Sequence, residues 1–569
     1  MFKRLFRTKS LEQLRASADE PEHQLKKNLG AFDLTMFGIG AIIGAGIFSS
    51  IGTAAAGNMA DGRLPAGPGL VISILVVALI CGFTALAYAE LASMIPVSGS
   101  AYTYAYATLG ELMAWIIGWD LLLEYAISNV AVAISWGDYA RSFFSTVFHV
   151  NIPGWLGMDP RSAMKPTEAC IQQFGHMVQK SDWHWQIFNT FGNDAWWHFW
   201  NHIHPKVWVD HLTQLVGPGV GERLTMIANA KHGLLDGAAL FANWDVVKAA
   251  PTVAGMPITI NFLAVVITAL ITWLCYIGIK ESARVNSVMV IIKVLILLAV
   301  VGLGIKFISP ANWHPFVPHG WKGIQAGAAI IFFAFIGFDA VSTTAEECKD
   351  PGRDLPRGIL GSLVICTFIY AAVALVVTGM LHYTRLGGIA DPLSYIFTEH
   401  KMYGIAAVIS FGAVIATTAA LLVYQVGQPR IFMSMSRDGL LAPWFGKVHD
   451  TFKTPSHATV LTGFLVAIPA ALLNIDEVVE LANIGTLFAF VIVCVAVLLL
   501  RKRRPEAPRK FRMPFAWFVA PAGILGCFWI AKGLPALTWY RFFIWLGIGL
   551  VIYFLYGSRK SRLETPTAS

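Results

Sequence analysis

Long apolar runs separated by short polar connections dominate this chain. A bilayer core about 30 Å thick needs about 20 apolar residues per helix. Twelve runs fit this length, near residues 32–57, 69–93, 112–143, 259–279, 285–308, 323–345, 358–380, 402–426, 457–474, 479–500, 515–532 and 541–557. Several contain Gly or Pro, which membrane helices tolerate better than soluble helices do. The pattern therefore predicts an all-α polytopic membrane protein with twelve transmembrane helices.

The composition agrees with this prediction and excludes several other classes. Only 13% of the 569 residues are charged and 56% are hydrophobic, whereas soluble domains carry roughly 25% charged residues. Intrinsic disorder, collagen and coiled coils need far more charge or a short repeat. Six of the seven cysteines lie in or beside apolar runs, which argues against a disulfide-rich scaffold.

The Lys and Arg residues of the connections predict the orientation. With a cytosolic N-terminus, the inner connections hold 26 of these residues and the short outer links hold seven, which places both termini in the cytoplasm of a cell-membrane protein. This topological role explains the net charge of +8 without a nucleic-acid partner. The basic run from Arg501 to Arg512 can also contact anionic membrane lipid, although the topological role is favoured.

The resulting organisation has seven parts. They are a cytosolic N-terminal segment (1–30), helices 1–3 (31–144), an extracytoplasmic insertion (145–258), helices 4–10 (259–500), a basic cytosolic loop (501–514), helices 11–12 (515–557) and a cytosolic tail (558–569).

The insertion is rich in His and Trp, with eight of the fifteen His and eight of the nineteen Trp. His198 and His202 lie one helical turn apart and can share a metal, but packing of Trp and His at a membrane interface is favoured over a metal site. We expect a small extracytoplasmic cap that shields the outer entrance or docks a partner. Wild-type uptake and expression after its deletion would contradict this expectation.

Few ionisable residues fall inside the apolar runs, and each is costly there unless it serves a function. Asp120 and Glu124 are four residues apart and share one helix face. Lys293 follows Arg284 by nine residues, roughly 14 Å along a helix, so it lies near the bilayer centre. A buried lysine can exchange a proton, and a functional role is favoured for it over snorkelling or a static ion pair. For Asp339 a static role and a functional role stay open.

Glycines predict interruptions in two of the runs. Gly38, Gly40, Gly44 and Gly46 lie within nine residues of the first run. The pair Gly40 and Gly44 alone suggests close helix packing, but the whole set also allows the helix to break and present backbone N–H groups to a carboxylate. The segment Phe333–Asp339 holds the corresponding place in the sixth run. Interrupted segments at matching places in two halves indicate a transporter site.

At these residues the sequence resembles the cationic amino acid transporter family of the amino acid–polyamine–organocation (APC) superfamily. The matching segments are Gly38–Phe48, Tyr88–Tyr102, Gly118–Tyr125, Lys280–Asn286 and Phe333–Pro351. The resemblance implies a leucine-transporter-type fold, in which helices 1–5 and 6–10 form a 5+5 inverted repeat and helices 11 and 12 are peripheral.

The resemblance also implies roles for individual residues. The substrate carboxylate would meet the backbone at Ile42, Gly44, Ala45 and Gly46, and the α-ammonium would meet carbonyls at Phe333, Ala334 and Ile336. Phe338 would be an aromatic gate. Lys293 matches the lysine that replaces a sodium ion in proton-coupled relatives, with Glu124 as its partner for proton coupling and Asp120 nearby as a candidate substrate contact. Ala45 stands where relatives often have Ser or Thr, so only its backbone can contact the carboxylate.

The functional prediction is a secondary active transporter, a proton-coupled L-amino acid symporter that works by alternating access. An amino acid exchanger and an amino-acid-binding membrane sensor stay open as alternatives. Asp120 and Glu124 favour a cationic substrate only where Lys293 does not neutralise them, so a broad range of L-amino acids is preferred. An enzyme is not expected, because the sequence has no His-Glu-x-x-His, Gly-x-Ser-x-Gly or Walker A motif. No cofactor or metal is expected.

Overall fold

The computed structural model describes residues 7–9, 29–58, 63–95, 100–164, 237–253, 256–277, 283–452 and 454–561. Within these ranges the chain forms two compact units. The larger unit contains residues up to His149, Ala264–Ala470 and Ile475 onwards, and the smaller unit contains Val150–Leu263 and Ala471–Asn474. His198 and His202, and most of the predicted N-terminal segment, lie outside the described residues.

The chain is mainly helical. The described α-helices that start before residue 300 are α3 (Ala31–Ile42), α4 (Ala45–Phe48), α5 (Ser50–Ala56), α6 (Leu70–Met94), α7 (Ser100–Thr108), α8 (Glu111–Phe148), α9 (Pro160–Ala163), α15 (Gly237–Leu240), α16 (Trp244–Ala249), α17 (Phe262–Ile277) and α18 (Ala283–Gly304). The later ones are α19 (Gly320–Ile331), α20 (Pro351–Met380), α21 (Pro392–Glu399), α22 (Tyr403–Arg437), α23 (Ser456–Leu472), α24 (Ile475–Arg503), α25 (Ala516–Ala531), α26 (Ala536–Ile552) and α27 (Ser558–Lys560). Two 3₁₀-helices, η6 (Phe332–Phe335) and η7 (Asp339–Glu347), follow α19.

Eight helical segments of the described chain are long and apolar enough to cross a membrane. They are Gly67–Met94, Glu111–Phe148, Ser287–Phe307, Gly320–Ala345, Pro351–Met380, Tyr403–Arg437, Ile475–Arg503 and Ala536–Lys560. Four further apolar helices, α3, α17, α23 and α25, have 12 to 17 residues. The prediction of a polytopic helical membrane protein is therefore confirmed, while the count of twelve spans and the inverted repeat stay predictions.

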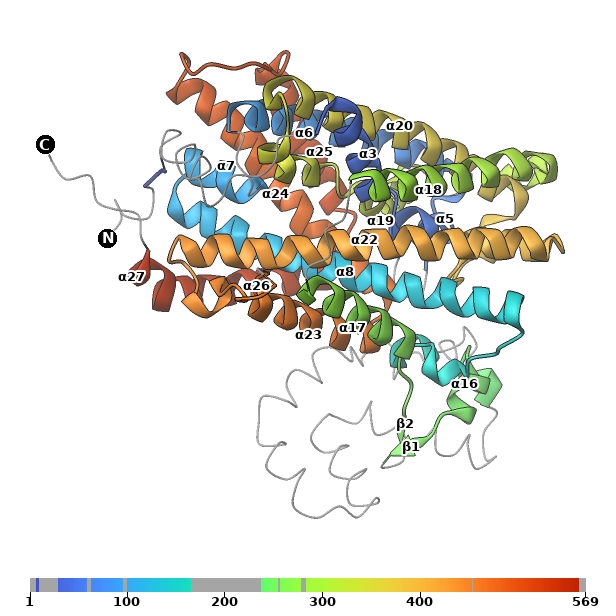
Figure 1. Cartoon of the computed structure of the whole chain (residues 1–569). Coiled ribbons are helices and arrows are strands. Elements are labelled where there is room, and N and C mark those ends of the chain that lie inside the picture. The colour runs from blue at the N-terminus through green and yellow to red at the C-terminus, as the bar shows by residue number, and fades with distance from the viewer. Residues whose placement is uncertain are drawn as a thin grey trace, which may run out of the picture. The chain divides into compact units, whose positions relative to one another are not determined.

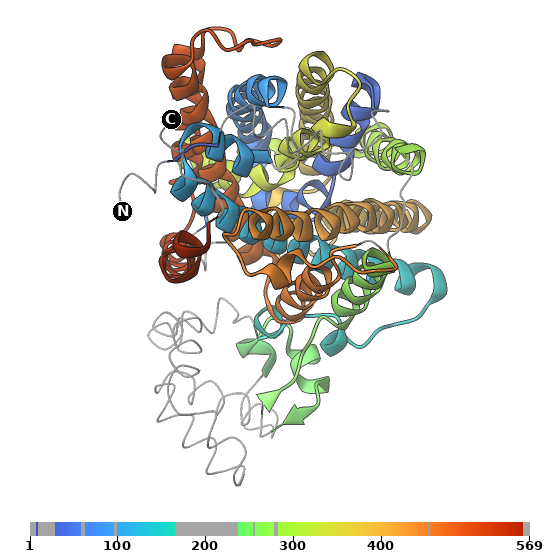
Figure 2. The same ribbon diagram turned by 60° about the vertical axis from the view of Figure 1, so that its left-hand side comes forward.

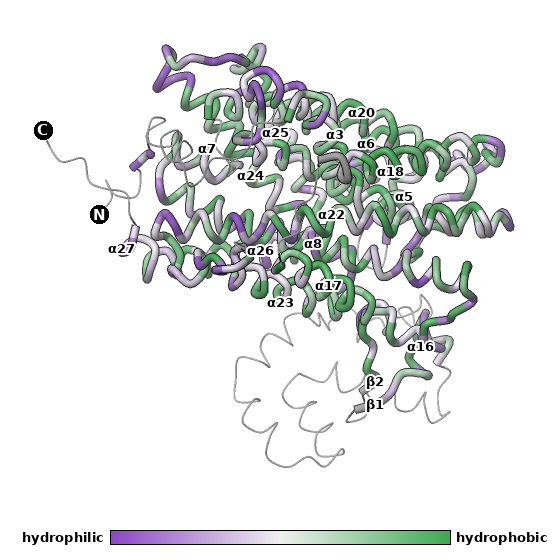
Figure 3. The backbone as a smooth tube through the Cα atoms, viewed as in Figure 1, coloured by the Kyte–Doolittle hydropathy of each residue, from purple (hydrophilic) through white to green (hydrophobic). Residues whose placement is uncertain are grey.

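Burial separates central helices from peripheral ones in the larger unit. In α8 and in the segment Gly320–Ala345, 89% of the most apolar stretch is buried, against 33% for Ser287–Phe307 and 22% for Ala536–Lys560. The central helix α8 packs along α22, as both views show, and also contacts α24 (Figures 1 and 2). Polar residues gather at helix ends and in the connection after α24 (Figure 3). The central helices are thus the ones that can enclose a site away from lipid.

The smaller unit contains a short antiparallel hairpin, which the all-α prediction did not include. Strand β1 (Thr252–Val253) pairs with β2 (Met256–Pro257). A small apolar core forms around Ala163, Phe241 and Val247. Helix α9 is capped by the Asp159 carboxylate, which accepts hydrogen bonds from the backbone N–H groups of residues 161 and 162.

Candidate functional site

The first transmembrane segment breaks between α3 and α4. Ile43 is extended (φ −76°, ψ 95°) and Gly44 leaves the helical region (φ −145°, ψ −149°) before α4 begins at Ala45. Helix α4 runs into α5 through the helical residue Ser49. Among the described residues, the backbone N–H groups of Ala45 and Gly46 find no hydrogen-bond acceptor. Such N–H groups at a helix start favour an anion.

The sixth segment is also interrupted, directly after η6. Ile336 is extended (φ −61°, ψ 138°), and Gly337 has a φ of +117°, a conformation that L side chains rarely adopt. The Asp339 carboxylate accepts a hydrogen bond from the Gly337 N–H at 3.2 Å. The break therefore depends on a glycine and on a nearby carboxylate, and the resumed segment is the 3₁₀-helix η7.

The two breaks lie against each other. A Cβ atom added to Gly46 would lie 2.3 Å from the Ala334 Cα atom, and one added to Gly337 would lie 2.8 Å from the Ala41 carbonyl carbon. Only glycine allows the backbones to approach this closely. The structure thus brings the predicted carboxylate-binding residues of the first segment next to the predicted ammonium-binding residues of the sixth.

Lys293 joins this arrangement from α18. Its fully buried ammonium donates hydrogen bonds to the carbonyl oxygens of Gly40 (2.6 Å) and Ile43 (2.9 Å). An unbroken helix would use these carbonyls itself, so the break leaves them free to accept from Lys293. A cation at the C-terminal end of α3 also interacts favourably with the helix dipole. Tyr370 adds a further bond, from its hydroxyl to the Ile42 carbonyl at 2.9 Å.

The described contacts of Lys293 do not include Glu124, its predicted partner for proton coupling, so that partnership stays a prediction. The Lys293 ammonium donates instead to backbone carbonyls at the break in the first segment. Glu124 faces the Thr486 hydroxyl and lies near two further carboxylates, those of Asp120 and Asp339. The backbone carbonyls at the break satisfy the ammonium instead, which the sequence spacing could not reveal.

Asp120 and Glu124 are buried one turn apart on α8, as the spacing predicted. Both carboxylate oxygens of Asp120 lack a hydrogen-bond partner in the described structure. A Cβ atom at Gly485 would lie 2.9 Å from one of them, so this carboxylate faces α24. A buried carboxylate without a donor is costly, so Asp120 remains a candidate site residue.

Helix α24 contributes residues that the sequence reasoning missed. Besides Gly485 and Thr486, it carries Asn483, whose side-chain amide donates to the Ala329 carbonyl at 2.6 Å near the end of α19. Polar residues in the otherwise apolar run 479–500 were the available signal. They attach α24 to the interrupted sixth segment.

Phe338 lies in an aromatic cluster. Its ring is 6.0 Å from the ring of Tyr88 and 5.0 Å from that of Phe490, measured between centroids. Phe338 is fully buried, and Phe333 is 5% exposed. All the predicted site residues are buried in this conformation, so a substrate can reach the site only after helices or side chains move.

The chain is similar in sequence to known membrane transporters over most of its length. Residues 29–555 match the family described as amino acid permease. The chain is 40% identical to the branched-chain amino acid permease BcaP of Bacillus subtilis (strain 168), over 98% of this chain and 99% of that protein. It is 38% identical to the methylthioribose transporter of the same strain, with the same coverage. It is 30% identical to the vacuolar cationic amino acid transporter 4 of Arabidopsis thaliana, over 88% of this chain and 68% of the relative.

Proposed function

Because the chain belongs to the amino acid permease family, we propose that it is a proton-coupled L-amino acid symporter that carries its substrate into the cytoplasm by alternating access. The observation that carries this proposal is the contact of two interrupted segments at Gly46 and Ala334. Transporters use unwound segments of this kind to bind substrates near the bilayer centre.

The backbone at the two breaks suits both ends of an amino acid. The free N–H groups at Ala45 and Gly46, with Ile42 and Gly44 beside them, hold the carboxylate. The α-ammonium is held by backbone carbonyls at the 3₁₀ turn and the break after it, those of Phe333, Ala334 and Ile336. Because the substrate carboxylate and α-ammonium both bind backbone atoms, these contacts recognise any L-amino acid. Selectivity for the substrate side chain comes from the protein side chains around it.

Proton coupling is assigned to Lys293. When charged, its ammonium donates to the Gly40 and Ile43 carbonyls and holds the end of α3 next to the substrate backbone. Loss of the proton weakens this attachment and allows the break to rearrange. A fixed ammonium at this place also disfavours sodium coupling by charge repulsion. Glu124 is the second proton-coupling group of the proposal, as a buried carboxylate that lies within electrostatic range of Asp339 and Asp120.

The proposed substrates are a broad range of L-amino acids, with apolar side chains preferred. Phe338 closes the site together with the rings of Tyr88 and Phe490, and aromatic surfaces favour apolar groups. Two relatives are named for branched-chain amino acids, the Bacillus protein and a Lactococcus protein at 28% identity. Asp120 is the candidate contact for a polar or cationic side chain.

Uptake of labelled leucine into proteoliposomes tests the proposal. An inward proton gradient should drive accumulation, and the other L-amino acids should compete to different degrees. Accumulation that does not depend on the proton gradient but requires amino acid inside the proteoliposomes would identify an exchanger instead. Binding that changes protein fluorescence without any uptake would identify a sensor.

A further inference from the structure

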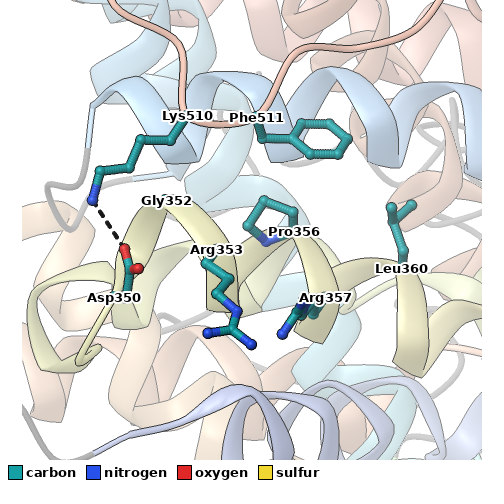
Figure 4. Close-up of a pocket in the computed structure, with 8 residues that line it drawn as sticks. All are labelled: Asp350, Gly352, Arg353, Pro356, Arg357, Leu360, Lys510 and Phe511. Carbon is teal, nitrogen blue, oxygen red and sulfur yellow. Dashed lines mark hydrogen bonds and ion pairs between the residues drawn. The ribbon is translucent and has the colours of Figure 1, made fainter.

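A cavity of about 610 Å³ opens between the first turns of α20 and the connection that follows α24. Its lining residues are Asp350, Gly352, Arg353, Pro356, Arg357, Leu360, Lys510 and Phe511 (Figure 4). It is separate from the transport site, since no residue of the two breaks lines it. The positive-inside pattern of the sequence places this end of α20 at the cytosolic membrane surface.

The cavity carries excess positive charge. Arg353 and Arg357 are exposed and one helical turn apart, and neither side chain has a hydrogen bond or ion pair with the described part of the chain. Lys510 is already paired with Asp350, with 3.0 Å between the ammonium and the carboxylate. That hydrogen bond holds the pKa of the Asp350 carboxyl below its usual value, so the pair stays ionised and neutral overall. Arg353 contributes by its charge to the same lowering of the Asp350 pKa, but neither guanidinium group is hydrogen-bonded to the described part of the chain, so both can bind an anion.

An apolar track continues from these guanidinium groups along α20. Leu360, Val364 and Phe368 follow Arg353 and Arg357 at intervals of three or four residues, which places all five on one helix face. The Val364 side chain is 52% exposed and that of Phe368 is 72% exposed. In a membrane-spanning helix such a face meets lipid chains. One surface thus presents two cations at its end and exposed apolar groups along its length.

We propose that this surface is a binding site for an anionic phospholipid. The phosphate is held by Arg353 and Arg357, whose planar guanidinium groups suit bidentate binding of phosphate oxygens. An acyl chain lies along Leu360, Val364 and Phe368. This continuous apolar track favours a lipid over free phosphate, because a soluble anion has no apolar group that could pack against it. Basic pockets between helices on the cytosolic side are typical of such sites.

Native mass spectrometry of the purified full chain tests the proposal, with phosphatidylglycerol and phosphatidylcholine as probes. The wild type should retain phosphatidylglycerol in preference. The double variant R353Q/R357Q should bind phosphatidylglycerol roughly 30-fold more weakly, since each lost arginine near an anionic headgroup accounts for about a fivefold change. The control R437Q/R559Q removes two exposed arginines that lie outside the cavity and outside the basic run 501–512, and it should stay close to wild type.

Two further measurements separate a lipid from a free anion. Phe368→Ser should weaken binding of phosphatidylglycerol and leave binding of its water-soluble headgroup, glycerophosphoglycerol, unchanged. Inorganic phosphate at millimolar concentration should not displace the lipid. Equal lipid binding by the cavity variant and the control variant would overturn the proposal. So would displacement of the lipid by inorganic phosphate, which would make the cavity a site for a free anion.

Discussion

At the scale of single residues, Lys293 shows how one side chain can serve both packing and transport. It lies on the buried face of α18 with Val290, Leu297 and Val300, while Leu295 and Leu298 face outward. Its ammonium replaces the backbone donors that α3 loses at its break. The same hydrogen bonds that stabilise the broken helix therefore depend on the protonation of one lysine.

Replacement of this lysine separates coupling from folding. We expect Lys293→Met to abolish stimulation of uptake by a proton gradient, because coupling between two ligands is typically worth about 1–3 kcal/mol and the proposal assigns it to Lys293 together with Glu124. Substrate counterflow, which needs no gradient, should persist at a reduced rate. Gradient-stimulated uptake by the methionine variant at the wild-type level would contradict the role of Lys293.

Gly46 gives a second prediction at this scale. We expect Gly46→Ala to reduce uptake roughly tenfold or more, since the added methyl group collides with the Ala334 backbone and overpacking typically costs about 1–3 kcal/mol. The matched control is Gly82→Ala in α6, where no atom lies within 4 Å of the added Cβ position. The control should transport normally. Similar uptake by both variants, measured at equal protein levels, would argue against a tight crossing of the two segments.

At the scale of elements, the sequence predicted the break in the first segment better than it predicted the second break or the contacts between helices. Four glycines in the first run predicted an interrupted helix, and the structure breaks it at Ile43 and Gly44. The second break had a weaker signal, because Gly337 alone provides the left-handed backbone. The facing of Glu124 towards Thr486 could not be predicted, since helix spacing states which residues share a face but not which helix they meet.

Helices α6 and α24 are joined by a buried ion cluster that can be tested for stability. The Glu90 carboxylate accepts from Arg501 (2.5 and 3.0 Å), from Arg509 (3.1 Å) and from the Met513 N–H (2.8 Å). We expect Glu90→Gln to lower the melting temperature of the purified protein clearly, because removal of one partner from a buried ion cluster costs about 3–5 kcal/mol.

The matched control for Glu90 is an exposed pair. Glu399 pairs with Arg385 on the surface, and such pairs contribute only about 0–1 kcal/mol. Glu399→Gln should therefore leave the melting temperature almost unchanged. If both variants have the melting temperature of the wild type, the Glu90 cluster does not stabilise the packing of α6 and α24.

At the scale of the whole molecule, the arrangement of charge predicts the topology. The described part of the larger unit contains eight helical segments able to cross a membrane. The Lys and Arg bias of the connections predicts that both termini are cytosolic. Polypeptide length and hydropathy were sufficient to predict the class of protein. The predicted runs 457–474 and 515–532 match α23 and α25 to within two residues. The exact ends could not be predicted, because the ends of a helix depend on its neighbours.

Reporter fusions to the C-terminus test this orientation. A fused fluorescent protein that folds only in the cytoplasm should be bright, and fused alkaline phosphatase, which needs the periplasm, should be inactive. The opposite pattern would place the tail outside and reverse every assignment of cytosolic and outer connections.

The central claim is that substrate and proton move together through the two crossed breaks, with Lys293 as the coupling group. Its most direct test is a proteoliposome that contains a pH-sensitive dye and the purified protein, with no imposed gradient. Addition of external leucine should acidify the lumen of wild-type vesicles and leave the lumen of Lys293→Met vesicles unchanged. Leucine entry into wild-type vesicles without any acidification of the lumen would contradict the account.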